Sequence, residues 1–227
     1  MQIKHVFFDL DHTLWDFETN SKKAYEICFK EHRIPVDIED FLNKYIAINF
    51  DYWKLYREEK VTKEALKYGR LKDSFNAISY PISDELIERI SIEYLEHLPK
   101  FNTLFDGAIE VLNYLKPKYQ LHIITNGFSE VQVFKLEKSG ILHYFDELIT
   151  SESVGVKKPN PRVFHFALKK ANALAHQSVM IGDSLEADVQ GALSVGMQAI
   201  HFNPTQIESQ EKSEIEIRSL FEIKRFL

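Results

Sequence analysis

The sequence predicts an α/β protein in which a Rossmann-like parallel sheet carries helices on both faces and a helical segment is inserted after the first strand. Three observations support this fold class. An apolar run of β-branched and aromatic residues, Ile3–Phe8, is typical of a short strand buried on both faces. Residues 17–98 carry apolar side chains at helical spacing, whereas strand and helix patterns alternate from about residue 101 onward.

The inserted segment is predicted to be a small α-helical bundle. Its apolar residues recur at intervals of three and four, without strand-like alternation. Pro35, Thr62 and the Tyr80-Pro81 step interrupt this pattern and indicate the turns between helices. We therefore expect a helical cap domain at residues 17–100 and a core domain formed by residues 1–16 together with 101–227.

The rest of the chain supplies the other strands of the sheet and the helices that cover it. Asp106 is expected to cap the first of these helices, and Asn160-Pro161 is a helix start in which a cap is followed by proline. Gly140 and Gly196 mark helix ends. The expected order is a helix to 116, a strand at 120–125, a helix at 130–139, a strand at 147–150, a helix at 160–173, a strand ending at 183, a helix carrying Asp188, a strand at 197–202 and a final helix at 214–226.

The composition is that of an ordinary globular protein. The 227 residues are 44% hydrophobic and 27% charged, with a net charge of −6 and no basic patch that would suit a nucleic acid. The single cysteine, Cys28, excludes an internal disulfide and is expected to be buried. No signal peptide and no apolar run of membrane-spanning length is recognised. We expect a soluble cytoplasmic protein without membrane or nucleic-acid partners, either a monomer or a weak homodimer.

Two acids follow the first strand and flank one leucine. Ligands of open α/β sheets bind at the carboxyl ends of the strands, where Asp9 and Asp11 are placed. Asp9 can attack phosphorus as a nucleophile, and Asp11 can protonate the leaving oxygen and later deprotonate a water. Thr13 can bind a phosphoryl oxygen or hold the turn. An isolated Asp-x-Asp is as readily a solvated strand end, so the assignment depends on the other motifs.

A second strand ends in a hydroxyl, an amide and a glycine, namely Thr125, Asn126 and Gly127. Ser129–Gln132 follows and fits a helix capping box, which would gather backbone N–H groups beside Asn126. The stretch therefore predicts an anion-binding loop in which Thr125 and Asn126 bind a phosphoryl group. Ordinary turn chemistry is the alternative explanation for these residues.

The later motifs add a cation and two more acids. Lys158 precedes Pro159 in a loop before a helix, and the alternative for it is a surface lysine. Asp183 ends a third strand, whose apolar run begins at Val179, and Asp188 lies on the next helical turn. Mg²⁺ prefers hard oxygen ligands, so Asp183 together with Asp9 is a candidate metal site. Asp188 could bind the metal through water, orient Lys158, or only favour its helix N-terminus. Together with Asp9 and Asp11, these are the parts of a magnesium-dependent phosphoryl-transfer site.

The four motifs, in this order, resemble those of the haloacid dehalogenase superfamily of phosphohydrolases over the whole chain. Asp9 with Asp11 matches the first motif, Thr125 the second and Lys158 the third, because the family's lysine directly precedes a proline. Asp183 with Asp188 matches the fourth. The resemblance implies a helical cap inserted after the first motif, Mg²⁺ as cofactor, and the backbone carbonyl of Asp11 as a further metal ligand.

A narrower resemblance concerns the stretches 124–128 and 151–160. They are similar to those of bacterial 5′-nucleotidases that act on pyrimidine and non-canonical pyrimidine nucleotides. The resemblance implies a phosphomonoesterase for a small-molecule phosphate ester, namely a pyrimidine nucleoside monophosphate.

Other functions on the same fold stay open. A phosphatase or phosphomutase for a small sugar phosphate or phosphoglycolate would keep the same residues. A 2-haloacid dehalogenase would need neither an acid at position 11 nor a metal, and a non-catalytic binding module would have no need of both Asp9 and Asp11.

Overall fold

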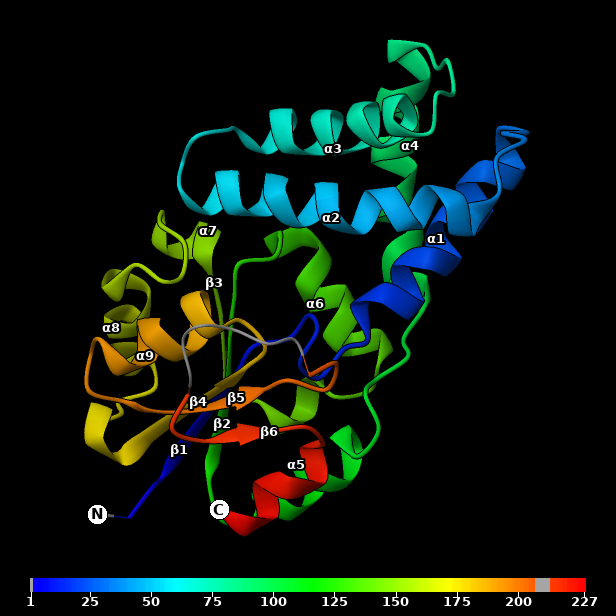
Figure 1. Ribbon diagram of the computed structural model, residues 1–227. Coiled ribbons are helices and arrows are strands. Elements are labelled where there is room, and N and C mark those ends of the chain that lie inside the picture. Colours follow the sequence, from blue (N-terminus) through cyan, green and yellow to red (C-terminus); the bar gives the residue numbers. More distant parts are fainter. Residues whose placement is uncertain (1, 207–212) are drawn as a thin grey trace. The chain divides into compact units, whose positions relative to one another are not determined.

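The computed structural model describes residues 2–206 and 213–227. The contacts between residues divide the chain into two compact units. Figure 1 shows the whole chain, with colours that follow the sequence from the N-terminus to the C-terminus. One unit, here called the sheet unit, joins Met1–Phe17 to Asn102–Leu227, and the other, the helical unit, is Glu18–Phe101. Within the described ranges, no helix is both long enough and apolar enough to cross a membrane.

The helical unit, which is described in full, consists of successive α-helices joined by short connecting segments. Asp37, Thr62 and Ser83 each cap a helix by accepting a hydrogen bond from a backbone N–H in its first turn. These caps fall at the three interruptions that the sequence indicates. The helices are α1 (Phe17–Glu31), α2 (Ile38–Arg57), α3 (Lys63–Ala77) and α4 (Asp84–His97), followed by a 3₁₀ turn at Leu98–Lys100.

Aromatic rings form the core of the helical unit. Tyr25 of α1 stacks on Tyr94 of α4, with ring centroids 4.2 Å apart. Arg70 of α3 is buried among these tyrosines and donates to the side-chain oxygen of Asn49 at 2.9 Å. Cys28 is buried as expected, and burial raises the pKa of its thiol to about 12. Ring stacking and the cation–π contacts of Arg70 thus hold α1, α3 and α4 together.

The sheet unit contains a parallel sheet in the strand order β3-β2-β1-β4-β5-β6, counting the described residues. The predicted fold class is confirmed. Phe8 of β1 lies in register with Ile123 of β2 on one side and Ile181 of β4 on the other, so β1 occupies the middle of the sheet. The strands are β1 (His5–Phe8), β2 (Gln120–Thr125), β3 (Glu147–Thr150), β4 (Ser178–Gly182), β5 (Gln198–Phe202) and β6 (Glu216–Ile217).

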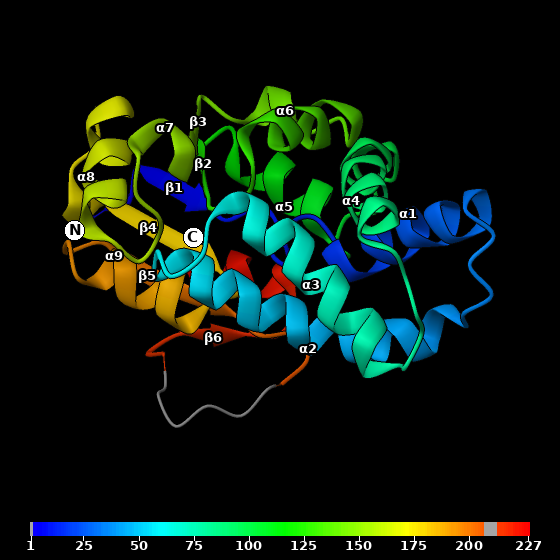
Figure 2. The same ribbon diagram turned by 90° about the horizontal axis from the view of Figure 1, so that it is seen from above.

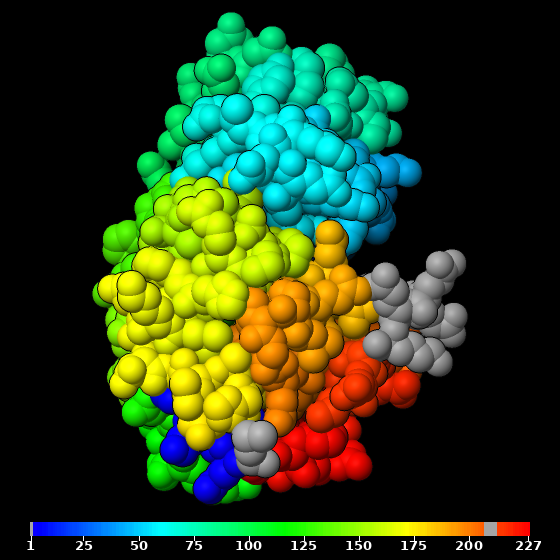
Figure 3. Space-filling view, turned by 90° about the vertical axis from the view of Figure 1, so that its left-hand side faces the viewer, coloured from blue at the N-terminus to red at the C-terminus, as the bar shows by residue number. Residues whose placement is uncertain are grey.

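Helices cover both faces of this sheet. In Figure 2, α8 (Pro161–Lys170) and α9 (Gly191–Leu193) lie on one side of the strands, and α5 (Ala108–Leu115) and α6 (Ser129–Lys138) lie on the other. Apolar side chains of α8 pack with Phe7, Ile124 and Met180 in one buried cluster. The surface of α8 and of the segment that carries α9 is seen in yellow and orange in Figure 3. The short α7 (Ser151–Val154), a π-helical turn at Leu185–Gln190 and 3₁₀ turns at Leu142–Tyr144, Ala175–Gln177 and Leu220–Arg225 complete the elements.

Three local expectations were wrong. Asp106 does not cap a helix: α5 begins at Ala108 after Gly107, whose φ of 82° belongs to a left-handed turn. The final helix at 214–226 is instead β6 followed by the 3₁₀ turn, because the backbone at Ile215 and Ile217 pairs with β5. Ser129 is the first residue of α6 and not its cap, since Phe128 takes the cap position without a side-chain bond.

Candidate active site

The candidate catalytic side chains meet at the carboxyl edge of the three central strands. Asp9 follows β1, Thr125 ends β2, and Asp183 follows β4. From β1 the chain adds β2 and β3 on one side, and it then adds β4 and the later strands on the other side. The strand order therefore reverses next to β1. Crevices at such points are where open α/β sheets bind their ligands.

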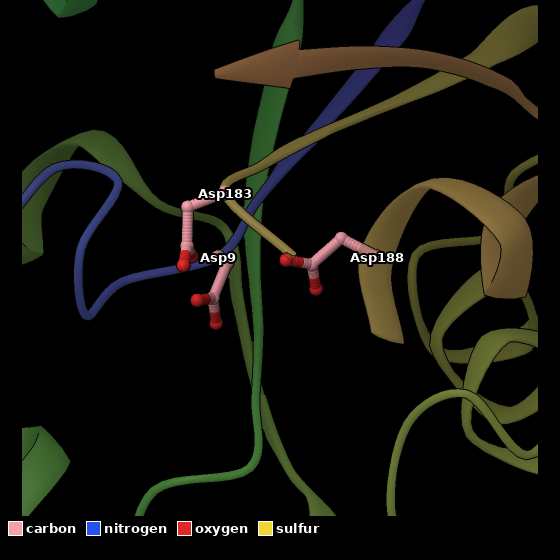
Figure 4. Close-up of side chains that lie close together, drawn as sticks. All are labelled: Asp9, Asp183 and Asp188. Carbon is pink, nitrogen blue, oxygen red and sulfur yellow. The ribbon is translucent and has the colours of Figure 1, made fainter. Parts of the chain in front are cut away.

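Three carboxylates converge at this edge. One carboxylate oxygen from each of Asp9, Asp183 and Asp188 lies within 4.8 Å of the other two. In Figure 4 the side chains of Asp9 and Asp183 come from the ends of β1 and β4, and Asp188 points toward them from the helical segment after β4. Thr13, which is fully buried, donates to Asp183 Oδ1 at 3.2 Å. Its hydroxyl therefore orients an acid of the cluster.

Lys158 brings the positive charge. Its side chain is 2% exposed, and its Nζ donates to Asp9 at 2.8 Å, to Asp188 at 2.6 Å and to the backbone oxygen of Ile124 at 2.7 Å. The ammonium group thus uses its three donors inside the protein. Burial alone would lower the pKa of Lys158, but the carboxylates of Asp188 and Asp9 raise it above the ordinary value.

The carboxylate of Asp188 binds both Lys158 and the backbone of its own loop. One carboxylate oxygen accepts from Lys158, and the other accepts from the backbone N–H of Ser184 at 3.1 Å. Gly182 makes room for this carboxylate, because a Cβ at that position would lie 2.3 Å from Asp188 Oδ2. Of the alternatives that the sequence leaves open for Asp188, these contacts favour the orientation of Lys158.

Burial raises the pKa of the other two acids, Asp9 and Asp183. Burial raises the pKa of Asp9 well above its ordinary value, although Lys158 opposes this effect. Burial, reinforced by the nearby charge of Asp188, raises the pKa of Asp183 to about 7. Without a further cation, the ionised forms of Asp9 and Asp183 are therefore costly.

The acidic cluster fits a divalent metal ion. Three carboxylates and one ammonium group leave two negative charges when all are ionised, which a divalent cation would balance. The donors that remain are carboxylate oxygens, which hard cations such as Mg²⁺ prefer. Asp9 and Asp183 are the acids suited to hold the ion, since both oxygens of Asp188 are already engaged.

The loop after β2 is held by its own side chains. Thr125 Oγ1 accepts from the backbone N–H of Gly127 at 3.0 Å. The amide of Asn126 donates to the backbone oxygen of Lys158 at 3.0 Å and accepts from its N–H at 2.8 Å. Asn126 therefore ties the second motif to the third, and the side-chain groups expected to bind a phosphoryl group are used here to shape the loop.

Sequence reasoning missed two residues of α6, Gln132 and Lys135. Lys135 Nζ lies 2.5 Å from Asp11 Oδ1, and Gln132 Nε2 donates to Asp11 Oδ2 at 3.0 Å. The sequence pattern instead assigns Gln132 to a capping box. The signal that could have found them is their position, because Gln132 and Lys135 share the buried stripe of α6 with the apolar Val131 and Leu136. Polar side chains in the apolar phase of a helix need partners.

Comparison with known proteins is consistent with this geometry. The family model described as haloacid dehalogenase-like hydrolase matches residues 3–196. The chain is 31% identical to the pyrimidine 5′-nucleotidase YjjG of Escherichia coli, over 91% of this chain and 88% of that protein. It is 33% identical to a glyceraldehyde 3-phosphate phosphatase of Methanothermobacter thermautotrophicus, over 96% of this chain and 93% of that protein.

A solved structure shares the fold over the full length. The magnesium-bound HAD-hydrolase YfnB of Bacillus subtilis superposes with a TM-score of 0.90 at 27% identity, covering 100% of this chain and 99% of that one. The matched family model spans the strands that carry Asp9, Thr125 and Asp183. The chain therefore belongs to the haloacid dehalogenase-like hydrolases, and its kinship with phosphatases places it among the phosphoric monoester hydrolases of that family.

Proposed function

We propose that this protein is a Mg²⁺-dependent 5′-nucleotidase that cleaves pyrimidine nucleoside monophosphates through a phosphorylated Asp9. The observation that carries the proposal is the pairing of Asp9 with Lys158 at the end of β1, two residues before a second acid, Asp11. One acid thus lies among the carboxylates proposed to bind the metal, and the side chain of the other is bound by Lys135 of α6. Two carboxylates in different surroundings are suited to two different roles.

Three groups would hold the metal ion. They are the carboxylates of Asp9 and Asp183 and the backbone carbonyl of Asp11. When bound, Mg²⁺ supplies positive charge that offsets the negative charge of the phosphoryl oxygens and of the acids. Lys158 adds a fixed positive charge beside Asp9.

The reaction would proceed in two displacements. A carboxylate oxygen of Asp9 forms a bond to phosphorus while the bond from phosphorus to the ester oxygen breaks, and Asp11 gives its proton to the departing alkoxide. Asp11 then takes a proton from water, and the resulting hydroxide attacks the phosphorus of phosphorylated Asp9. Inorganic phosphate leaves, and Asp9 is restored as a carboxylate.

The second motif would bind the transferring group. Thr125 is 1% exposed at the end of β2, and its hydroxyl is oriented by Gly127 and Gln132. Thr125 and the backbone of the loop around Asn126 are the groups proposed to contact phosphoryl oxygens. The loop is held to Lys158 by Asn126, so the two motifs keep a fixed spacing around the phosphoryl group.

The choice of substrate rests on the relatives. YjjG supports a pyrimidine nucleotide, as does the resemblance of stretches 124–128 and 151–160. The second candidate is a small phosphosugar, which the glyceraldehyde 3-phosphate phosphatase supports at a comparable identity of 33%. A dehalogenase is disfavoured because a halide leaving group needs no proton from Asp11.

The test is a phosphate-release screen over nucleotides and sugar phosphates. We expect release with Mg²⁺, none after chelation with EDTA, and none from Asp9→Asn, in which an amide of nearly the same shape is a poor nucleophile. Asp9→Asn purified in parallel also reports contaminating phosphatase. Full release with EDTA would exclude the metal, and retained turnover by Asp9→Asn that is free of contaminating phosphatase and of deamidation would exclude the covalent route. Transfer between sugar hydroxyls without free phosphate would indicate a mutase.

A further inference from the structure

The carboxylate of Asp11 accepts hydrogen bonds from two side chains of one helix, α6. Lys135 binds one of its oxygens at 2.5 Å, and Gln132 binds the other at 3.0 Å. We infer that Gln132 and Lys135 form a positioning clamp that fixes the direction in which Asp11 presents its carboxyl group to the leaving oxygen. This inference rests on the proposed function, since it assigns the clamp to the acid of that reaction.

The surroundings of Lys135 suit such a role. Its side chain is 3% exposed, and a buried ammonium group needs a close oxygen acceptor. Oδ1 of Asp11 is such an acceptor both in the carboxylate and in the acid form, in which Oδ2 carries the proton that is donated. The Nζ of Lys135 lies 4.2 Å from the ring centroid of Trp15 and 5.2 Å from that of Phe17. The rings and the carboxylate enclose the ammonium group, so Lys135 has little freedom to move away from Asp11.

Gln132 connects the clamp to the second motif. Its Nε2 also donates to Thr125 Oγ1 at 2.7 Å. Gly127 packs directly against this amide, because a Cβ there would lie 2.1 Å from Gln132 Nε2. One amide thus sets the spacing between Asp11 and the hydroxyl proposed to bind the phosphoryl group.

The backbone around Asp11 is already fixed, which leaves its side-chain torsions to be set. Leu10 O accepts from the N–H groups of Leu14 and Trp15 at 3.0 and 2.9 Å. His12 N–H donates to Trp15 O at 3.0 Å. Within this tight loop, the carboxyl group of Asp11 can still rotate, and Gln132 and Lys135 are the side chains that restrain it.

The two acids proposed to act in the reaction therefore contact different lysines. Lys158 contacts Asp9, and Lys135 contacts Asp11. Loss of Lys135 should impair the proton donation by Asp11 and spare the attack by Asp9. Esters whose leaving groups need a proton will then suffer more than p-nitrophenyl phosphate, whose leaving group needs little help.

The experiment compares kcat/KM for an alkyl phosphate and for p-nitrophenyl phosphate, because kcat/KM reports the steps up to release of the leaving group. Loss of a general acid typically costs about 10²–10⁴-fold, so misplacing it by Lys135→Met should cost about 10–100-fold on the alkyl ester and under about threefold on p-nitrophenyl phosphate. Lys135→Arg should restore most of the loss, since it keeps a charged donor. Lys138→Met, which removes an exposed lysine from the same helix, is the matched control and should match the wild type.

A double-mutant comparison separates positioning from general damage. Lys135→Met should cause no further loss on the alkyl ester in an Asp11→Asn background, because the clamp acts only through Asp11. Equal losses on both esters, or losses that add to those of Asp11→Asn, would overturn the clamp while leaving the phosphatase assignment intact. A wild-type protein that releases phosphate from no ester would overturn the proposed function and the clamp with it.

Discussion

At the scale of single residues, buried charges lie close together in the site because each carboxylate accepts a hydrogen bond from a side chain of the protein. Asp9 and Asp188 share Lys158, whereas Asp183 has the hydroxyl of Thr13. A hydroxyl donor compensates an ionised carboxylate less than an ammonium group does. Asp183 thus needs an added cation when it is ionised, which agrees with the rise of its pKa to about 7.

This need predicts how Asp183 contributes to metal binding. Binding of a ligand to the folded state at about 100 times its Kd stabilises that state by about 2.7 kcal/mol, and such a gain raises the Tm of a chain of this size by about 5–10 °C. We expect Mg²⁺ to raise the Tm of the wild type and to raise that of Asp183→Asn little or not at all. Thermal unfolding with and without Mg²⁺ measures this directly.

The control is Glu186→Gln, which removes an exposed acid three residues further along the chain. It should keep the full Mg²⁺-dependent rise in Tm. A rise that survives in Asp183→Asn and disappears in Glu186→Gln would place the ion away from the proposed cluster.

At the scale of elements, the sheet carries a buried histidine pair between β1 and β2, away from the carboxyl edge. His5 Nδ1 and His122 Nε2 lie 3.2 Å apart, and His122 stacks on Phe7 with centroids 4.6 Å apart. Burial lowers the pKa of His122 to about 4, helped by His5 and Lys116 and opposed by Asp146. Burial also lowers the pKa of His5, with Lys4 adding to this and Asp146 opposing it. The strands therefore hold neutral imidazoles.

The pair predicts a dependence of stability on pH. Because the pKa of His122 is about 4 in the folded state and about 6.5 when unfolded, the unfolded chain binds more protons between these values. The contribution of this histidine to the free energy of unfolding is therefore fully present above about pH 6.5 and declines as the pH falls toward about 4. His122→Leu should flatten this part of the profile, measured by urea unfolding between these pH values. His165→Leu, at an exposed position of α8, should leave the slope unchanged, and an unaltered slope in His122→Leu would contradict the assignment.

Helix α6 shows that local spacing in the sequence does not predict which residues a side chain contacts. The spacing of Ser129 and Gln132 satisfies a capping rule, yet Gln132 faces Asp11 and Thr125. The rule is local, whereas the direction of Gln132 depends on how α6 packs against the sheet. The prediction of a final helix was wrong for a related reason. Ile217, Leu220 and Ile223 are buried and spaced by three, as in a helix, but Ile217 belongs to the edge strand β6.

At the scale of the whole molecule, the fold class and the meeting point of the motifs follow from the sequence. Asp9, Thr125 and Asp183 each end or follow a buried apolar run, and a parallel sheet brings such ends to one edge. Of the adjacent Lys157 and Lys158, the one directly before Pro159 was expected in the site, and it is Lys158 that contacts Asp9. The role of Asp188 could not be decided from spacing, because it depends on which neighbours donate hydrogen bonds to its two carboxylate oxygens. Gln132 and Lys135 were missed because none of the four catalytic motifs contains them.

The last prediction concerns which phosphate ester the whole molecule prefers. The groups at the carboxyl edge are suited to a phosphoryl group and a metal ion, and none of them distinguishes one base from another. Any preference for a base must therefore come from other parts of the chain, and a site sized for one ring would exclude purines sterically. By similarity to YjjG, we expect UMP, dUMP and TMP to be hydrolysed faster than AMP and GMP.

The measurement is kcat/KM for these five nucleotides beside glyceraldehyde 3-phosphate, β-glucose 1-phosphate and phosphoglycolate, with Mg²⁺ throughout. p-Nitrophenyl phosphate serves as a reference that carries no base or sugar. A preference of more than about tenfold for a sugar phosphate or phosphoglycolate would mean about 1.4 kcal/mol of transition-state stabilisation directed at the smaller substrate. That result would favour kinship with the glyceraldehyde 3-phosphate phosphatases over the nucleotidases, because the shared phosphoryl site contributes equally to every ester in the series.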